Sequence, residues 1–185
     1  APAGSARLYI SRAGLPVKRG SMLLESRIET LLRRDGYEVF HPQEHPIEVQ
    51  IARYKAARQI VALDGSALHL AGMIVPEDCR VAIINRGPSQ NIEDYQRQFR
   101  HFIGIEPVRI DAILRYWFQA GRRVVKRETH ALADFPTLGQ GLHQAGFISS
   151  TEGWENPDAA TIAAAVADRA QRCGVTLQEY SADGA

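Results

Sequence analysis

Short apolar runs alternate with longer segments of helical periodicity over residues 7–114 of the chain. The runs are rich in Val, Ile, Tyr and Phe, which favour β-strands. The strands that we expect are 7–12 (RLYISR), 37–42 (YEVFHP), 60–63 (IVAL), 80–85 (RVAIIN) and a fifth within 106–114 (EPVRIDAIL). The intervening segments place apolar residues on one helical face. The helices that we expect are 21–35, 46–59, 65–74 and 91–104.

Local signals mark several of these helix ends. Ser21 is expected to cap the first helix and Gly36 to end it, and Pro46 is suited to open the second. A βαβ alternation of this kind predicts a Rossmann-like α/β fold, with a doubly wound, mainly parallel sheet and helices on both faces.

The pattern weakens after about residue 115. We expect residues 1–115 to form a Rossmann-like core and residues 116–185 a helical extension that packs on the same domain. An Ala-rich helix is expected to start near Asn156 or Asp158 and to end at Gly174.

Two aromatic groups have a simple structural interpretation. Tyr95, Phe99 and Phe102 share one helical face, which predicts a stripe in the core. Trp117 and Phe118 precede the basic stretch 122–127, which either meets a partner or an anionic surface or, more simply, belongs to an amphipathic helix with a solvated basic face.

Composition narrows the function classes. The 22 basic and 21 acidic side chains give a net charge of +1, which lacks the excess typical of nucleic-acid binders. There is no apolar run long enough for a transmembrane helix and no signal peptide, so we expect a cytoplasmic protein, with peripheral contact at the inner membrane face as an alternative. The two cysteines are far apart and are interpreted as ordinary thiols. The chain lacks an initiating Met and starts almost directly on a strand, so we expect an excised domain.

Three predicted strands end in residues with notable chemistry. These endings are Ser11-Arg12, Asp64-Gly65-Ser66 and Asn85-Arg86-Gly87. Doubly wound sheets bind ligands outside the carboxyl ends of their strands. We therefore expect the three loops to meet at one ligand-binding edge.

The turn after the third strand is suited to an anion. Gly65 lets the backbone approach a ligand, and the N–H groups of Ser66 and Ala67 open a helix whose dipole favours negative charge. Asp64 is interpreted either as the N-cap of this helix or as a ligand to a ribose hydroxyl, a sugar hydroxyl or a neighbouring arginine. The turn is neither a GxGxxG motif nor a P-loop, so it is a weak signal by itself.

Arginines follow two of the strands on the same predicted edge. Arg12 and Arg86, with the helix N-terminus, would make a diphosphate clamp, because arginine forms bidentate contacts with phosphate; the alternative for each is a solvated loop position. His69 lies one helical turn after Gly65 and is interpreted either as a hydrogen-bonded structural histidine or as a residue near the ligand. His41 and His45 have no third ligand at metal spacing.

Residues 7 to about 88 resemble glycosyltransferase family 61. The resemblance rests on "LYISRAG", "LESRIETLLRRDGYEVFHPQE" and "VQIARYKAARQIVALDGSALHL", in the family's order and spacing. The matching positions in the last stretch are Gln50, Ile51, Ala57, Val61, Gly65 and Leu68. The sequence departs from the family at Asp64, where the family has His, at Leu70, where it has Asn, and at Leu24, where it has Asn before Glu25.

This resemblance implies a GT-B-like architecture in which the present chain is the C-terminal, donor-binding half. It implies a transferase that moves a sugar from a nucleotide-sugar donor to a glycan acceptor in polysaccharide or glycoconjugate synthesis, with a missing N-terminal domain as partner. Asp64 or His69 is the candidate general base. The residues expected to bind the donor diphosphate are Ser11, Arg12, Gly65, Ser66, Ala67 and Arg86.

No metal site is evident, because the sequence has no DxD triplet. Two rival hypotheses remain open at this point. One is a degenerate, non-catalytic module in a polysaccharide-assembly complex, and the other is a different nucleotide- or phosphate-dependent α/β enzyme, against which the absence of GxGxxG counts.

Overall fold

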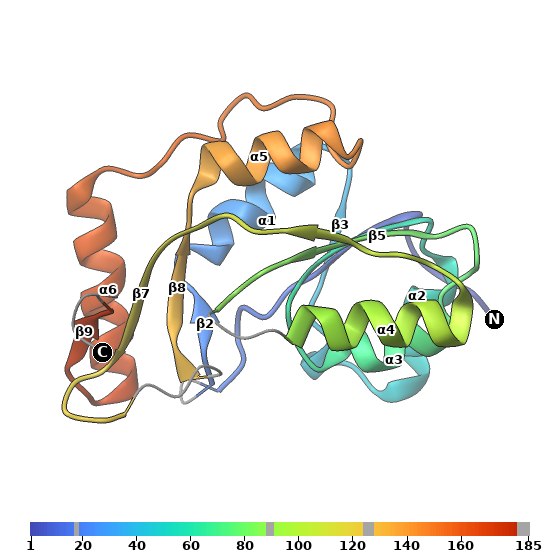
Figure 1. The fold of residues 1–185 in the computed structure, drawn as a ribbon. Coiled ribbons are helices and arrows are strands. Elements are labelled where there is room, and N and C mark those ends of the chain that lie inside the picture. Colours follow the sequence, from blue (N-terminus) through green and yellow to red (C-terminus); the bar gives the residue numbers. More distant parts are fainter. Residues whose placement is uncertain (17–18, 88–90, 124–127, 181–185) are drawn as a thin grey trace.

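A computed structural model describes residues 1–16, 19–87, 91–123 and 128–180 (Figure 1). Its main sheet contains five strands in the order β3-β1-β4-β5-β6, and every neighbouring pair is parallel. The strands are β1 (Arg7–Ile10), β3 (Glu38–Phe40), β4 (Gln59–Leu63), β5 (Arg80–Ile84) and β6 (Val108–Ile110). This arrangement confirms the predicted Rossmann-like α/β fold.

Helices cover both faces of this sheet (Figure 1). On one face lie α1 (Glu25–Arg34) and α5 (Phe135–Gln144), and on the other lie α2 (Ile47–Ala56), α3 (Ala67–Ile74) and α4 (Asn91–Ile103). A 3₁₀ turn, η1 (Pro42–Glu44), precedes α2. Successive side chains of a strand point to opposite faces, so β4 sends Val61 to the α1–α5 core and Ile60 to the α2–α4 core.

The strand order creates a topological switch point between β1 and β4. From β1 the chain passes outward to β3 on one side, and from β4 it passes outward through β5 to β6 on the other. The loops that leave β1 and β4 therefore diverge to opposite sides and leave room for a ligand at the carboxyl edge. The sequence of the chain places Arg12 and Asp64-Gly65 at this point.

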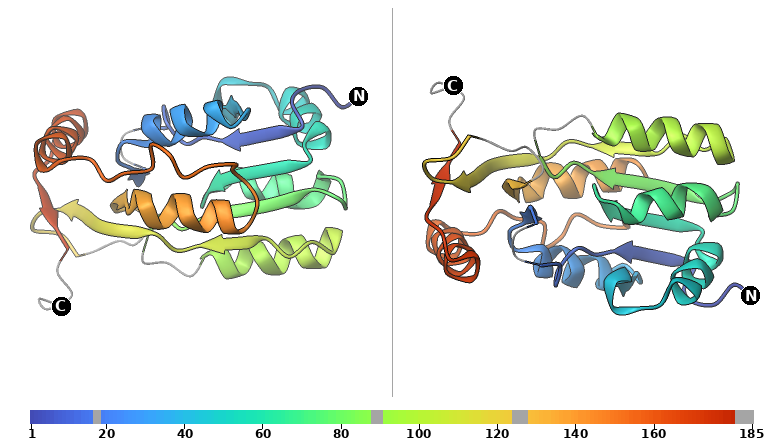
Figure 2. Two further views of the ribbon diagram at one scale, coloured as in Figure 1. Left: turned by 90° about the horizontal axis from the view of Figure 1, so that it is seen from above. Right: turned by 90° about the horizontal axis from the view of Figure 1, so that it is seen from below.

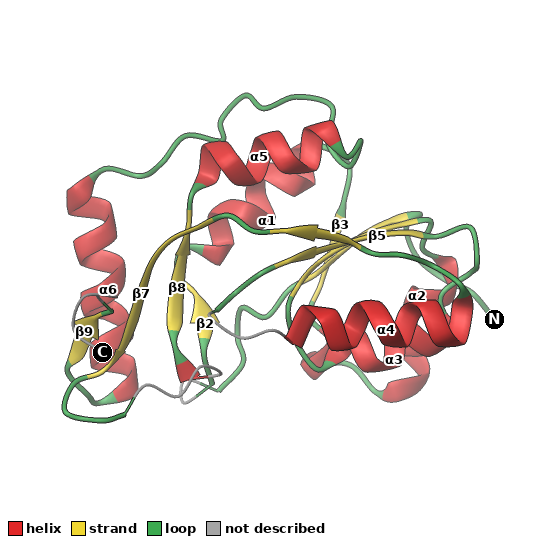
Figure 3. Cartoon of the chain, in the orientation of Figure 1, coloured by secondary structure: helices red, strands yellow, loops and turns green. Residues whose placement is uncertain are grey.

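A second, four-stranded sheet lies beyond this carboxyl edge, together with α6 (Ala159–Cys173) (Figures 2 and 3). Its order is β2-β8-β7-β9. Its strands are β2 (Ser21–Met22), β7 (Ile113–Gln119), β8 (His130–Ala133) and β9 (Leu177–Glu179). The expected helical extension thus contains strands as well as helices.

Trp117 and Phe118 lie in β7 and not in the amphipathic helix that we expected as the simpler account. This strand pairs with β8 on one side and with β9 on the other, and its aromatic residues suit a pleated surface. Residues 124–127 of the basic stretch lie outside the described residues.

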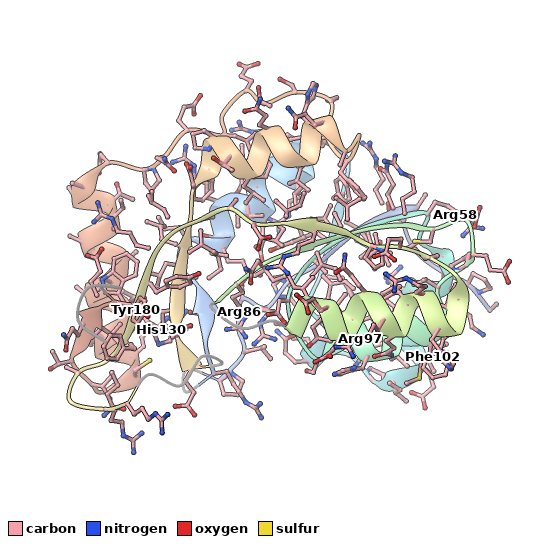
Figure 4. All side chains as sticks on the ribbon, in the orientation of Figure 1. Arg58, Arg86, Arg97, Phe102, His130 and Tyr180 are labelled. Carbon is pink, nitrogen blue, oxygen red and sulfur yellow. The ribbon has the colours of Figure 1, made fainter. Side chains whose placement is uncertain are left out.

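Two further local predictions were wrong. Ser21 does not cap α1, because Ser21 and Met22 pair with β8 and the helix starts at Glu25. Phe102 is 59% exposed although Tyr95 and Phe99 are buried, because it lies in the last turn of α4, beyond the elements that cover the rest of the stripe (Figure 4). Asp158 does cap α6, since its carboxylate accepts a hydrogen bond from the Thr161 N–H, and Gly174 ends that helix with φ 65°.

Candidate functional site

The carboxyl edge of the main sheet brings together the arginines that follow β1 and β5. Arg12 and Arg86 act electrostatically on one another, and Asp64 acts on both. Figure 4 shows Arg86 between the main sheet and the second sheet. The predicted convergence of the three loops at one edge is therefore present for these residues.

The loop after β1 fixes the position of Arg12. Its backbone N–H donates to Glu25 Oε1 over 2.7 Å, and its Nη2 lies 3.4 Å from the Gly20 carbonyl oxygen. Arg12 Nε is buried and meets no hydrogen-bond acceptor among the described residues. Burial lowers the pKa of Arg12, and the carboxylates of Glu25 and Asp64 oppose this effect.

Gly65 allows Arg12 to reach this position. A Cβ added to Gly65 would lie 3.2 Å from both Cδ and Cζ of Arg12, and closer still to Nη1. Any other residue would push the guanidinium away, so the glycine is required here for close approach between a backbone and a side chain.

Arg86 is the more deeply buried of the two arginines, with only 6% of its surface exposed. Its Nε donates to the Asp64 carbonyl oxygen over 3.2 Å, whereas its buried Nη1 has no acceptor in the described part of the chain. Burial, followed by the positive charge of Arg12, lowers the pKa of Arg86. Two nearby cations with unused donors form a site that favours an anion.

Asp64 does not cap α3, contrary to the structural alternative that we considered. The N-cap position belongs to Ser66, which makes no side-chain capping bond. The Asp64 carboxylate is buried and opposes the lowering of the pKa of both arginines. Of the uses that we considered for Asp64, its electrostatic partnership with neighbouring arginines is the one observed.

Glu25 accepts several hydrogen bonds from β1 and from the loop that follows it. Its Oε1 accepts hydrogen bonds from the Tyr9 hydroxyl at 3.0 Å, the Ser11 hydroxyl at 3.1 Å and the Arg12 N–H. Burial raises the pKa of Glu25, and these three hydrogen bonds oppose the rise. The Ser11 hydroxyl also lies 2.7 Å from Glu29 Oε1, so it points to these carboxylates inside the fold.

The remaining predicted site residues, Ser66, Ala67 and His69, lie in the first turn of α3 and differ in their surroundings. Ser66 is exposed and Ala67 is half-buried at the first turn. His69 points toward α4: its Nδ1 lies 2.7 Å from Gln98 Oε1 and its ring centroid 4.9 Å from that of Tyr95. The structure therefore places His69 in a polar contact between two helices and gives it no contact with Arg12 or Arg86.

A groove of about 420 Å³ adjoins Arg12. One wall consists of residues 12–15 and 19–26, and the other is the face of α6 that includes Ala165 and Arg169. Ser21 lines the groove, and its hydroxyl lies 2.9 Å from His130 Nδ1. Burial, followed by the positive charges of Arg169 and Arg86, lowers the pKa of His130 to about 4.

Sequence reasoning missed three residues of this region. Glu25 was recognised only as a family position, and its location at the first turn of α1 was the available signal. Ser21 and His130 come together through the parallel pairing of β2 with β8, which joins residues 109 positions apart, and no local pattern announces such a pairing.

The described residues were also compared with the requirements of a metal site and of a membrane-spanning helix. They contain no group of three or more His, Cys, Asp and Glu side chains arranged to hold a metal ion. None of the helices within the described ranges combines the length and apolar character needed to cross a bilayer.

Comparison with known proteins identifies the N-terminal part of this fold. Residues 2–82 match the family model described as Glycosyltransferase 61, which confirms the resemblance seen in the sequence. The matched residues include β1, α1, α2, β4 and α3, and therefore Arg12, Glu25 and Gly65. No curated protein matches the chain.

Proposed function

With the family match over residues 2–82 as the premise, we propose that this chain binds the nucleotide-sugar donor of a glycosyltransferase. The diphosphate lies at the carboxyl edge between Arg12 and Arg86, beside Gly65. The donated sugar passes to a glycan acceptor in polysaccharide or glycoconjugate synthesis. A further domain of the same protein supplies the rest of the acceptor site.

The observation that carries this proposal is the pair of arginines at the switch point. Each has a buried N–H group without an acceptor among the described residues, and Arg86 is almost fully buried. Asp64 and Glu25 offset part of the charge of the two arginines, but they leave these buried N–H donors without an acceptor. A buried donor without an acceptor is unfavourable, and a diphosphate accepts bidentate hydrogen bonds from guanidinium groups.

The same geometry supports a role in the chemical step. Cleavage of the bond between sugar and diphosphate leaves negative charge on the departing diphosphate. Glu25 fixes the Arg12 backbone, and the guanidinium groups of Arg12 and Arg86 contact the carbonyl oxygens of Gly20 and Asp64, respectively. Donors that are fixed in advance stabilise developing charge without reorganisation.

The direct test is a chemical-shift titration of isotopically labelled protein with nucleoside diphosphates of different bases and with their sugars. We expect one base to shift the amides of Ser11, Gly65 and Ser66 saturably. Absence of any shift at millimolar ligand would contradict donor binding by this chain.

Replacing Arg12 tests the clamp itself. Arg12→Ala is expected to weaken binding of the nucleoside diphosphate by about 1–3 kcal/mol, as expected for loss of a charged hydrogen bond. Calorimetric titration measures the effect. Arg97→Ala is the matched control, because Arg97 lies on α4 with 71% of its side chain exposed. Equal affinities for the Arg12 variant and the control would remove Arg12 from the site.

A second candidate function is a donor-binding module that does not catalyse transfer. It is favoured by the two residues considered as general base: Asp64 is buried against the arginines, and His69 is bonded to Gln98. A general base must be able to reach the acceptor hydroxyl. Measuring slow hydrolysis of the bound donor separates the candidates, because the catalytic alternative predicts hydrolysis and the binding module predicts a stable donor.

A further inference from the structure

The groove beside Arg12 has an excess of basic side chains. Its walls carry four arginines, Arg12, Arg19, Arg169 and Arg172, and two carboxylates, Glu25 and Asp168. The whole chain, with the groove included, carries a net charge of only +1. The positive charge is therefore a local property of this groove.

The two carboxylates offset only part of the positive charge of the groove. Glu25 is 4% exposed, and its Oε1 is occupied by three hydrogen bonds from within the fold. Asp168 lies 3.6 Å from Arg172, its neighbour one turn along α6. Arg19 and Arg169 form no ion pair within the described ranges, so their charges face the groove uncompensated.

The groove continues from the donor site. Arg12 belongs to both, since its guanidinium lies against Gly65 and its side chain also lines the groove. Arg169 and Arg86 both act on the buried imidazole of His130, which places α6 within electrostatic reach of the arginine pair. A sugar attached to a diphosphate at Arg12 can therefore extend into the groove.

We propose that the groove between residues 12–15 and 19–26 on one side and α6 on the other binds an acid-bearing sugar, with Arg169 as the residue that selects it. This inference rests on the proposed function and specifies its substrate class. A carboxylate or phosphate substituent pairs with guanidinium groups in a bidentate manner. A neutral sugar leaves those charges without a partner, so the site discriminates against it.

The small residues of α6 make room for such a ligand. Ala164 and Ala165 line the groove between Thr161 and Arg169, and their short side chains leave its volume of about 420 Å³ open. A cavity of this size suits a monosaccharide unit with its substituents. The acid group can belong to the donor sugar or to the acceptor glycan, and the chemistry of recognition is the same in both cases.

The test compares ligands that differ only in the acid group. Calorimetry measures binding of the nucleoside diphosphate alone, its neutral hexose derivative, its hexuronate derivative, and neutral and uronate-containing oligosaccharides. We expect the acid-bearing member of the donor pair or of the oligosaccharide pair to bind at least about tenfold more tightly, which corresponds to one charge-assisted contact.

Variants of α6 assign the preference to the groove. Arg169→Ala is expected to abolish it and to leave the affinity for the nucleoside diphosphate unchanged, whereas Arg169→Lys keeps part of it and Arg97→Ala keeps all of it. A preference in the donor pair identifies the donor sugar as the source of the acid group. A preference in the oligosaccharide pair identifies the acceptor.

The outcomes for the two proposals are distinguishable. If the nucleoside diphosphate does not bind, the proposed function fails and the oligosaccharide pair alone decides the inference. If it binds and neither pair shows a preference for the acid, the donor site stands and the inference is overturned. A preference that survives Arg169→Ala also overturns it.

Discussion

Leu24 adopts an unusual backbone conformation at the start of the candidate site. Its φ of 58° and ψ of 29° lie in the left-handed region, and it is the only non-glycine residue with positive φ among the described residues. Such a conformation costs a residue with a Cβ about 1–2 kcal/mol, and Asn tolerates it better than Leu. Leu24 is therefore a residue poorly suited to the backbone conformation that it adopts.

Leu24→Asn is therefore expected to stabilise the fold. The free energy of unfolding rises by up to about 1 kcal/mol, because relief of strain exceeds the loss of a partly buried apolar contact. Urea denaturation measures the change. Leu24→Ala loses the contact but keeps the strain, so it should be less stable than the original chain. Equal destabilisation by Asn and Ala would show that the strain is absent.

His130 makes stability depend on pH. Burial and the positive charges of Arg169 and Arg86 lower its pKa to about 4 in the folded chain, compared with an ordinary value of 6.5. Between these values the unfolded chain binds more protons than the folded one, so stability falls as pH falls through this window. One unit of pKa difference corresponds to about 1.4 kcal/mol.

His130→Gln is expected to flatten the pH dependence of stability between about pH 6.5 and 4. Denaturant unfolding of the two proteins across this range measures the difference. His101→Gln is the matched control, because His101 is exposed on α4. A His130 variant with the same slope as the original chain would mean that the buried imidazole does not titrate with folding.

At the scale of elements, a substitution in the turn between β4 and α3 is expected to weaken ligand binding without destabilising the fold. Gly65→Ala would place a Cβ against the end of the Arg12 side chain, and not against backbone. The Arg12 side chain is flexible and can move aside, so the cost in stability is small. The guanidinium group then no longer occupies its place beside residue 65 at the carboxyl edge of the main sheet.

We expect Gly65→Ala to weaken binding of the nucleoside diphosphate by at least about tenfold, since one charged contact is displaced, with little change in melting temperature. Calorimetry and thermal denaturation of the same samples report the two effects. Ser66→Ala, at an exposed neighbouring position, should change neither. A large loss of stability in the Gly65 variant would mean that the Arg12 side chain cannot move away from the added Cβ.

The alternation of strands and helices predicted the main sheet because each element carries its own periodic signal. Trp117 and Phe118 were expected in an amphipathic helix as the simpler account, because a short aromatic segment is ambiguous by itself. They form a strand because β8, the next described strand along the chain, pairs with them on one side and β9, which lies far along the sequence, pairs with them on the other. The arginine pair of the site was predictable from the strand ends, whereas Glu25, Ser21 and His130 depend on tertiary contacts.

At the scale of the whole molecule, the division at residue 115 crosses a shared hydrophobic core. The cluster that contains Tyr9, Val61 and Ile84 also contains Trp117, Phe135 and Trp154 from the later part of the chain. One face of the main sheet is therefore covered by residues on both sides of that division. Whether the two parts are separable can be measured.

A polypeptide of residues 1–115 is expected to lack a cooperative unfolding transition, because it exposes the sheet face that α5 covers. A chain that ends at residue 158 keeps α5 and should retain the transition with lower stability. Differential scanning calorimetry compares both with the full chain. Cooperative unfolding of the 1–115 polypeptide would establish it as an independent unit.

The packing of α6 differs from that of the other helices. It has 15 residues and none of them is fully buried, whereas α1 and α5 each bury several side chains in the core. Changes on its groove-facing side therefore disturb little of what keeps the molecule folded. Substitutions along this one helix are therefore expected to change the surface that the groove presents at little cost to the stability of the fold.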